Sequence, residues 1–390
     1  MSNRFHALPI SGKIITFILL LVITVSSASE LSVAMASTAT SSTNTETEEQ
    51  RREEERREST YQYIPDYTPR DFSNLTSIYR PIAVTLNNAP GALPQHGVRQ
   101  AEIIYETLVE GGITRMLAIF PDITELGSIG SIRSSRPYFV NIAEIHDAIF
   151  VHGGGSPQAL SMLGDRGSDH LDGIFGPGYN AFHRVSERAR IHSLFSSGAE
   201  VTQAIAAMDL RETHYSGFRS SLLYMPYADP DINTEETDES TRLSSTNTSV
   251  RGRNPRGSGR GTDISVRFSS SHTTRFRYDI SDNLYYISTQ RNERYIDGNN
   301  NNQVAVSNVI VIKTDISRIP GDGSGRLSIR ITGSGTGYYF NRGRYTEISW
   351  YSPNDTSQFE YTLPDGSPLI LEYGKTYICI VPIDARIRAN

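Results

Sequence analysis

The sequence has almost no cysteine, and this shortage excludes several kinds of protein. Cys379 is the only cysteine among 390 residues, so we expect neither an internal disulfide framework nor a multi-cysteine metal site. Lysine is scarce too, because Lys13, Lys313 and Lys375 are the only lysines and arginine supplies the other basic side chains. Excess positive charge is also lacking, since 37 basic and 43 acidic side chains give a formal net charge of −6. A nucleic-acid-binding domain is usually basic, so we expect no nucleic acid partner.

Long apolar runs are absent except for one near the N-terminus. Arg4 and Lys13 precede an apolar run over Ile14–Val25, and small residues then lead to an Ala-x-Ala site that ends at Ala36. These three features are typical of a secretory signal peptide, which we predict over residues 1–36. The apolar run spans only about 18 Å as a helix, and a hydrocarbon core needs about 30 Å. A membrane anchor over residues 14–36 is therefore the less favoured alternative.

The predicted signal peptide indicates where the protein works. We expect an extracytoplasmic protein, secreted or at the cell surface, that contacts a membrane only if residues 14–36 are not removed. Cys379 lies far from the predicted cleavage site. We therefore expect no lipid on an N-terminal cysteine.

Two low-complexity segments divide the remaining chain. Residues 37–74 begin with a stretch rich in Ser, Thr, Glu and Arg, and residues 229–261 are rich in Gly, Ser, Asn and charged side chains. Such compositions bury too little apolar surface to offset chain entropy, so we predict a disordered tether and a flexible linker or insertion. Two folded regions are left, residues 75–228 and residues 262–387.

The first folded region alternates strand-like and helix-like patterns. Short apolar runs predict buried strands over Ile82–Leu86 and Ala148–Val151. Pro137 and Pro157 each open a segment with helical apolar spacing, and proline is favoured at the first position of a helix. A third helix is predicted over Val201–Met208. This alternation predicts an α+β domain with a mixed sheet.

The second folded region contains short strand-like runs separated by Gly- and Asn-rich turns. The predicted strands are Arg275–Tyr278, Val309–Lys313, Leu327–Ile331, Ile348–Tyr351, Leu369–Tyr373 and Thr376–Val381. Strands at such spacing are typical of a mostly antiparallel β-rich domain. The whole chain is therefore predicted to be α+β, with an α+β domain followed by a β-rich domain.

A Gly-Gly pair between two apolar-rich runs predicts a β-hairpin. Gly111 and Gly112 supply the positive φ angles that a two-residue turn needs. This register places Arg115 diagonally between Glu106 and Glu110. Two carboxylates can serve as acid and base in glycoside hydrolysis, but a shared arginine would lower both pKa values. An ion-paired structural cluster is therefore favoured over a catalytic pair.

An arginine-rich segment stands beside the predicted helix that begins at Pro137. Arg133, Ser134 and Arg136 lie just before the helix N-terminus, where free N–H groups and the helix dipole attract anions. Guanidinium groups bind carboxylate or phosphate through two parallel hydrogen bonds, so the segment is a candidate anion site. In the alternative interpretation, the arginines pair with acidic side chains of the same domain, namely Glu106, Glu110 or Asp147.

A glycine-rich loop follows a predicted strand and opens the helix at Pro157. Gly153 and Gly154 would let the backbone approach a ligand closely, and Ser156 is suited to cap the helix. The loop lacks the lysine of a phosphate-binding P-loop and the Gly-x-Ser-x-Gly pattern of a nucleophile elbow. His152 is a candidate ligand contact or base, although a base needs a partner that the sequence does not reveal.

A basic stretch further along the chain contains His183 and Arg184. The histidine spacings match no zinc pattern, so we expect a solvated or phosphate-facing surface and neither a metal ion nor another cofactor.

Six short motifs stand in the order found in one bacterial family. They are Arg80–Val84, Tyr105–Arg115, Arg133–Phe139, Val151–Pro157, Asn308–Val311 and Gly374–Ile378. Through these motifs the sequence closely resembles the YerB-like family of predicted bacterial lipoproteins, which has paired N- and C-terminal domains of unknown function. The resemblance covers about residues 75–385 apart from the low-complexity insertion. It implies an exported, surface-tethered α+β protein, and it assigns no catalytic residue.

These observations predict an envelope protein that binds a polar or anionic ligand, such as a cell-wall polymer or an envelope protein, without catalysis. The candidate binding residues are Arg115, Arg133, Ser134, Arg136, His152, Gly153, Gly154, Ser156, His183 and Arg184. One alternative is a hydrolase of wall glycan or ester bonds that uses Glu106 and Glu110, or His152. Another is a structural partner in a surface complex.

Overall fold

The computed structural model describes residues 78–218, 220, 222–224 and 258–390. All of them belong to one compact unit that spans Tyr67–Asn390. The predicted signal peptide, the predicted tether and most of the predicted linker lie outside the described residues.

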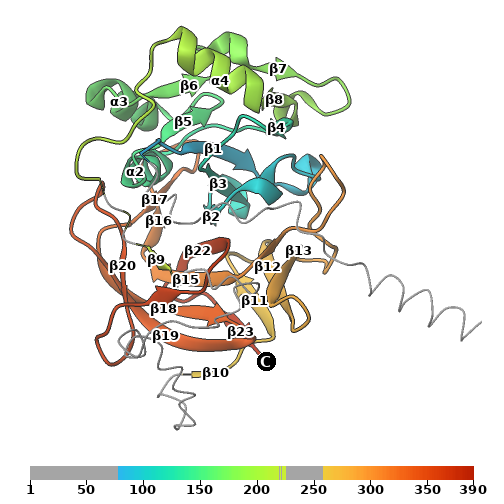
Figure 1. Cartoon of the computed structure of the whole chain (residues 1–390), viewed down its shortest axis with the longest axis vertical. Helices are drawn as coiled ribbons and strands as arrows, with labels where there is room; N and C mark the ends of the chain where they lie inside the picture. The colour runs from blue at the N-terminus through green and yellow to red at the C-terminus, as the bar shows by residue number, and fades with distance from the viewer. Residues whose placement is uncertain (1–77, 219, 221, 225–257) are drawn as a thin grey trace, which may run out of the picture. The chain divides into compact units, whose positions relative to one another are not determined.

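A mixed sheet of 11 strands runs through the described part of the chain, and both halves of the sequence contribute to it (Figure 1). The N-terminal half supplies β1 (Ile82–Asn87), β2 (Ile103–Leu108), β3 (Thr114–Phe120), β5 (Ile149–His152) and β6 (His170–Asp172). The C-terminal half supplies β10 (Ser258–Arg260), β15 (Asn308–Thr314), β18 (Gly333–Asn341), β19 (Arg344–Ser352), β20 (Glu360–Thr362) and β22 (Thr376–Pro382). The strand order is β10-β19-β18-β15-β22-β2-β3-β1-β5-β6, with β20 beside β19. β10 begins inside the segment that was predicted to be a linker.

The two halves of the sequence meet where β2 lies parallel to β22, and we call this pairing the β2–β22 seam. The register places Ile103 beside Thr376 and Thr107 beside Ile380. The hydroxyl of Thr107 also donates a hydrogen bond across the seam to the carbonyl oxygen of Ile380, at 2.9 Å. β22 has a strand on each side and is buried over Thr376–Val381, which explains its continuous apolar run.

Four smaller sheets complete the β structure of the described residues. The largest has the order β14 (Ala305–Val306), β13 (Leu284–Ser288), β12 (Thr273–Asp279), β11 (Asp263–Arg267) and β23 (Ile387–Ala389). β4 (Ser128–Gly130), β8 (Leu194–Ser197) and β7 (His183–Arg184) form another, while β16 (Ile316–Arg318) pairs with β17 (Leu327–Ile329) and β9 (Leu223–Tyr224) with β21 (Ile370–Leu371). Buried and exposed residues alternate along β11 and β12. Their inward side chains Val266 and Phe276 join the same core as Met116 of β3.

Three α-helices lie in the described part of the chain: α2 (Pro137–Ile145), α3 (Pro157–Arg166) and α4 (Gly198–Ala207). Phe139 of α2 and Leu163 of α3 share a core with Phe150 of β5, so these two helices cover one face of the central sheet. Val201 of α4 belongs to the core on the opposite face, together with Met116. None of the described helices is long and apolar enough to cross a membrane.

The predicted α+β fold class is confirmed. The helices that begin at Pro137 and Pro157 are present, and Ser156 caps α3 as predicted, since its Oγ accepts a hydrogen bond from the Ala159 N–H at 3.2 Å. The strand predicted over Thr376–Val381 is β22. The predicted boundaries of the two domains remain a prediction, although the central sheet is continuous across both regions.

The predicted two-residue turn between β2 and β3 is wrong. The N–H of Val109 donates to the carbonyl oxygen of Ile113 at 2.9 Å, which closes a loop of three residues. The register is therefore displaced by one residue and pairs Arg115 with Thr107. Because side chains alternate along a strand, this displacement turns Arg115 to the face opposite Glu106. The predicted cluster of Arg115 between two glutamates does not form.

Candidate functional site

A segment between β4 and α2 fills the space between the ends of β1 and β5. These two strands pair in parallel over only three residues each. Beyond that point the N–H of Arg133 donates to the carbonyl oxygen of Thr85 at 2.9 Å, and the N–H of Gly153 donates to the carbonyl oxygen of Arg133 at 2.9 Å. The carboxyl ends of diverging parallel strands are where ligands bind in open α/β sheets. The predicted arginine segment and the predicted glycine loop therefore meet at such an end.

Three arginines gather here around one carboxylate, and we call Arg115, Arg133, Arg136 and Glu110 the arginine cluster. Arg136 forms a bidentate (forked) ion pair with Glu110. Its Nε lies 2.6 Å from Oε1, and its Nη2 lies 2.7 Å from Oε2. Arg115 donates from Nη1 to the carbonyl oxygen of Ser134 at 2.8 Å, and its Nη2 lies 4.0 Å from Glu110. Arg133 donates from Nη1 to a backbone carbonyl oxygen at 2.9 Å. Three guanidinium groups thus face a single negative charge.

Burial and mutual repulsion act on the pKa values of this cluster. Burial, together with the charges of Arg136 and Arg133, lowers the pKa of Arg115 to about 9. Burial and the charge of Arg136 also lower the pKa of Arg133. Burial raises the pKa of Glu110, but its hydrogen bond and charge interaction with Arg136 bring that pKa below the ordinary value. Arginine side chains stay protonated in proteins, so three guanidinium groups beside one carboxylate give an excess positive charge that an anion would stabilise.

Several buried polar atoms at this end of the sheet have no hydrogen-bond partner among the described residues. They are Nε of Arg115, Nε of Arg133, Oγ1 of Thr85, Oγ of Ser131 and Nε2 of His152, which we call the unpartnered atoms. Buried polar atoms in native proteins are nearly always hydrogen-bonded. A group of them in one place therefore indicates a bound water, ion or ligand.

The strand registers place the side chains of Thr85, Arg115 and Arg133 on one face. Thr85 of β1 lies opposite Leu117 of β3, and Arg115 is two residues from Leu117, so Thr85 and Arg115 share a face. Arg133 lies opposite Thr85, because the bridge between Leu86 and Ile132 is antiparallel. The unpartnered atoms of these three residues therefore face the same side of the sheet.

His152 of β5 stands on this face as well. Its ring stacks on Phe150, with 4.9 Å between the ring centroids, and Phe150 is paired with Ala83. Ala83 is two residues before Thr85 on β1, so His152 and Thr85 lie on the same face at the end of their strands. The register thus adds an imidazole to the face that carries the arginines.

The hydrogen bonds of His152 fix its tautomer. Nδ1 lies 2.9 Å from the carbonyl oxygen of Gly154, which can only accept, so Nδ1 carries the hydrogen. Burial lowers the pKa of His152 to about 4, so the ring is neutral at pH 7. Nε2 therefore presents a lone pair, and this atom is the one that has no partner.

The glycine loop is held by Asp172 of β6. Its Oδ1 accepts hydrogen bonds from the N–H groups of Gly154 at 2.7 Å and Ile174 at 2.9 Å. Gly154 has a φ of +70°, and a Cβ on Gly153 would lie only 2.5 Å from Leu194 Cδ2. The positive φ of Gly154 favours glycine at that position, and Gly153 packs closely against the Leu194 side chain.

Two predicted site residues make their contacts outside the arginine cluster. His183 and Arg184 are exposed on β7. His183 faces Glu200 at 3.2 Å, and Arg184 donates to the carbonyl oxygen of Arg190 at 2.8 Å. In the described part of the chain, neither makes a hydrogen bond or an ion pair with the arginine cluster.

Three residues of the site were missed by sequence reasoning. Thr85 and Asn87 interrupt the apolar strand β1 at alternate positions, a signal that one strand face is polar, and Ser131 lies beyond the predicted segment. Asn87 is paired with Arg115, and its Nδ2 lies 2.8 Å from Nδ1 of His192. The polar alternation in β1 is the signal that could have found two of the three.

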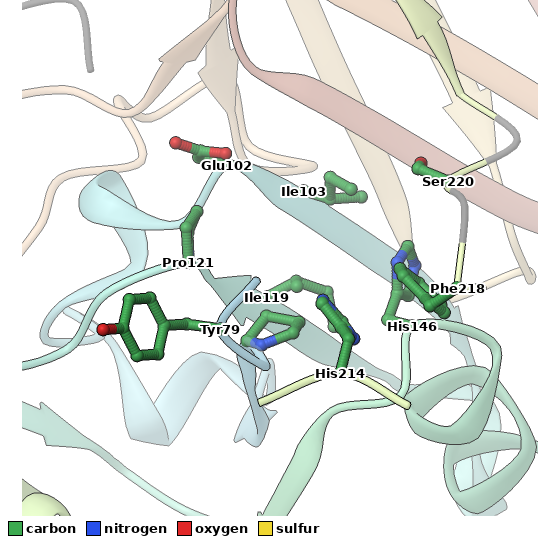
Figure 2. A pocket seen from close by; sticks show the side chains of 10 residues that line it. Tyr79, Glu102, Ile103, Ile119, Pro121, His146, His214, Phe218 and Ser220 are labelled. Atoms are coloured by element: carbon green, nitrogen blue, oxygen red, sulfur yellow. The ribbon is translucent and has the colours of Figure 1, made fainter. Parts of the chain in front are cut away.

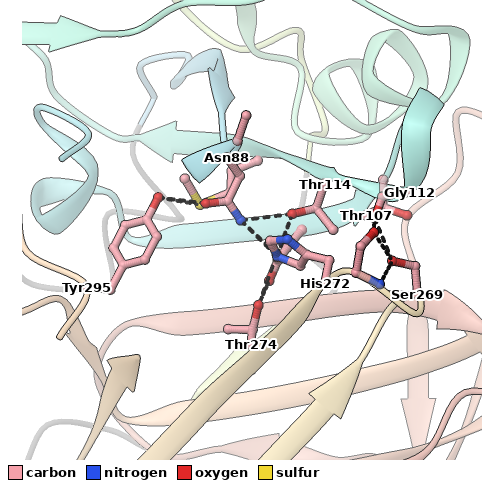
Figure 3. A network of polar contacts seen from close by, with 12 residues as sticks. Asn88, Thr107, Gly112, Thr114, Ser269, His272, Thr274 and Tyr295 are labelled. Atoms are coloured by element: carbon pink, nitrogen blue, oxygen red, sulfur yellow. Dashed lines mark hydrogen bonds and ion pairs between the residues drawn. The ribbon is translucent and has the colours of Figure 1, made fainter. Parts of the chain in front are cut away.

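Glu106 lies on the opposite face in a closed polar network, in which His272 stands between Thr114 and Thr274 (Figure 3). The fully buried carboxylate accepts hydrogen bonds from Asn88 (2.8 Å), Thr114 (2.6 Å), Thr274 (2.8 Å), Tyr377 (2.8 Å) and His272 (2.8 Å). Burial raises the pKa of Glu106, but the hydrogen bond and charge of His272 bring it below the ordinary value. Glu106 and Glu110 are thus engaged in separate networks and do not flank a common site.

Two cavities lie elsewhere in the described residues. The first, of about 20 Å³, is lined by side chains that include His146, His214 and Phe218 (Figure 2). Its volume is that of a single water molecule. The second, of about 200 Å³, is lined by Leu93, Pro94, Thr289, Glu293, Arg294, Tyr295 and Ile296. Neither contains a predicted site residue, and no three His, Cys, Asp or Glu side chains among the described residues are grouped to hold a metal ion.

Comparisons with known proteins assign the chain to a family. Residues 72–211 match the model described as "Protein of unknown function (DUF3048) N-terminal domain", and residues 264–378 match that of the C-terminal domain. The chain therefore belongs to this family of paired domains, and the resemblance found in its six motifs is confirmed.

Two similar proteins come from Bacillus subtilis. The "Putative lipoprotein YerB" of strain 168 is 29% identical over 303 residues, which cover 78% of this chain and 81% of that protein. A crystal structure of the YerB protein matches with a TM-score of 0.62 and 28% identity, and covers 80% of this chain and 94% of that chain.

Proposed function

We propose that this protein binds an anionic ligand of the cell envelope at the arginine cluster and does not transform it. The observation that carries the proposal is the imbalance of the cluster. Arg115 and Arg133 have buried Nε atoms without an acceptor, and Glu110 alone balances three guanidinium groups. An anion would accept hydrogen bonds from these Nε atoms, and its negative charge would balance the remaining guanidinium groups.

The arrangement suits phosphate or carboxylate better than a simple halide. Guanidinium is planar and donates in a fork that matches the paired oxygens of these anions. Arg136 already binds Glu110 in this way. The unpartnered Nε groups of Arg115 and Arg133 are left to donate to the ligand. The half-buried Arg133 marks the side from which an anion would enter.

The proposed place of action is outside the cytoplasm. It rests on the predicted signal peptide and on the similar protein that is named as a putative lipoprotein. Partners would then be a cell-wall polymer or an envelope protein with an acidic segment. Fractionation of cells that express the full chain tests this, and a cytoplasmic protein would contradict it.

Titration calorimetry with inorganic phosphate and with acetate tests the proposed site. Binding to the wild type is expected to fall at least about tenfold in Arg133→Gln, which removes the charge but keeps much of the side-chain volume. Arg318→Gln is the matched control, since Arg318 is exposed on β16, far along the chain from the cluster. Absence of binding to the wild type, or equal binding by the two variants, would overturn the proposal.

A further inference from the structure

We infer that the ligand carries a hydroxyl or N–H donor next to its anionic group, and that Nε2 of His152 accepts a hydrogen bond from that donor. The ligand class is a hydroxylated anion, that is, a phosphate or carboxylate attached to a polyol or sugar. This inference rests on the proposed anion site and specifies its ligand.

The first step is the hydrogen-bonding character of the unpartnered atoms. The Nε groups of Arg115 and Arg133 are donors, whereas Nε2 of His152 is an acceptor because Nδ1 carries the hydrogen. A simple carboxylate or a fully ionised phosphate satisfies the two donors only. It offers no hydrogen to His152, and its negative charge would repel the nitrogen lone pair.

The second step is the neighbouring position of Arg133 and His152 in the backbone. Gly153, which follows His152, is hydrogen-bonded to the backbone of Arg133 at 2.9 Å. Adjacent backbone segments joined in this way lie about 4.8 Å apart. The two side chains therefore start from neighbouring positions on one face, so a ligand that contacts both carries its anionic group and its donor in one small molecule, such as a phosphorylated or carboxylated polyol.

The third step is the pair of hydroxyls beside these positions. Oγ1 of Thr85 and Oγ of Ser131 are buried and without a partner among the described residues, and each can donate and accept. Such groups complement the hydroxyls of a polyol, which also donate and accept. The face thus offers donors for an anion, an acceptor in His152, and two hydroxyls of mixed character.

His152 is also fixed in direction by its surroundings. Its ring stacks against Phe150 and His170, with centroid distances of 4.9 Å and 5.3 Å, and Nδ1 lies 2.9 Å from the carbonyl oxygen of Gly154. These two ring contacts and the hydrogen bond of Nδ1 hold the direction in which Nε2 points. The acceptor is therefore available only to a group that enters the site.

The test compares matched pairs of ligands on the full chain. Calorimetry at pH 8, where phosphate monoesters are fully ionised and carry no P–OH donor, would measure glycerol 3-phosphate against methyl phosphate, and glycerate against acetate. The hydroxylated member of at least one pair is expected to bind about tenfold or more tightly than its partner, and that pair identifies phosphate or carboxylate as the anionic group. Glycerol alone is expected not to bind.

Variants then assign this preference to particular atoms. His152→Asn keeps a donor towards Gly154 but lacks Nε2, so the preference is expected to fall to about twofold or less. Thr85→Val is a second, isosteric variant that reduces the preference without disturbing the loop. His183→Asn is the matched control, because His183 is exposed on β7 and makes no hydrogen bond or ion pair with the arginine cluster or His152 among the described residues, and the preference is expected to persist.

Each outcome decides the inference. Equal affinity of both members in both pairs would show that an ordered water satisfies His152, and it would overturn the inference while leaving the anion site intact. A preference that survives in both His152→Asn and Thr85→Val would also overturn it. If none of the anions binds the wild type, the proposed function fails and the inference fails with it.

Discussion

His272 and Glu106 connect the two family domains through a buried contact. Nε2 of His272, which precedes β12, lies 2.8 Å from Oε1 of Glu106 on β2. Tyr377 of β22 donates to the other carboxylate oxygen at 2.8 Å. Glu106 therefore receives donors from the C-terminal domain on both of its oxygens, and we expect its charge to stabilise the joined structure.

The variant Glu106→Gln tests this role. At pH 7 it is expected to lower the free energy of unfolding by about 3 kcal/mol, because the amide nitrogen of Gln cannot accept and leaves buried donors such as Tyr377 without a partner. The pKa of Glu106 is lowered in the folded state, so its contribution is complete above the unfolded pKa and is lost as pH falls below it. Urea unfolding at pH 7 and pH 4 should therefore show a smaller loss of stability between these pH values in Glu106→Gln than in the wild type.

Glu347→Gln is the control for this prediction, because Glu347 is exposed on β19. Equal losses of stability in all three proteins would contradict the prediction.

The second prediction concerns the one carboxylate of the arginine cluster. Glu110→Gln removes the negative charge that competes with an anionic ligand, so phosphate affinity is expected to rise about fivefold, or about 1 kcal/mol across a high effective dielectric. Stability should fall, because Arg136 loses its forked partner. Calorimetry at low and high salt checks this, since screening should reduce the gain. A weaker affinity for phosphate would contradict the prediction. It would show that Glu110 holds the arginines in place for the ligand and that this effect outweighs its competition with the ligand.

Two buried threonines make a matched comparison of stability. The hydroxyl of Thr85 has no partner among the described residues, whereas that of Thr107 donates across the β2–β22 seam at 2.9 Å. Without ligand, Thr85→Val should leave the free energy of unfolding unchanged or raise it by about 1 kcal/mol, because an unsatisfied hydroxyl is costly to bury. Thr107→Val should lower it by about 1 kcal/mol, the net value of one hydrogen bond. Urea unfolding of both variants measures the difference, and a larger loss in Thr85→Val would show that its hydroxyl has a partner.

Local signals in the sequence were enough to predict many elements of the fold. Proline at the first position and a serine cap mark the start of α3, and an uninterrupted apolar run marks the buried strand β22. These features depend on neighbouring residues only. The register of the β2–β3 hairpin depends on whether Glu110 belongs to the turn, which glycines at Gly111 and Gly112 do not decide.

The candidate site was predictable in part for the same reason. Arg133 and Arg136 lie just before the start of α2, and Arg115 lies in the strand that follows a hairpin turn. Patterns of neighbouring residues were therefore enough to select these three arginines. Their relation to His152 arises from the segment that enters between β1 and β5. No periodicity encodes this insertion, and the unpartnered atoms follow from it.

The last prediction is that the two family domains fold only together. β2 would be an open edge without β22, and the side chains of both regions share their cores, with Tyr105 and Ile378 in one and Met116 and Phe276 in the other. A fragment of residues 67–224 should therefore unfold without a cooperative urea transition and expose apolar surface to a hydrophobic dye. Co-expression with residues 258–390 should restore a cooperative transition and co-purification of both pieces. A fragment of residues 67–224 that unfolds cooperatively by itself would contradict the prediction, because it would show that the seam is an interface between independent domains.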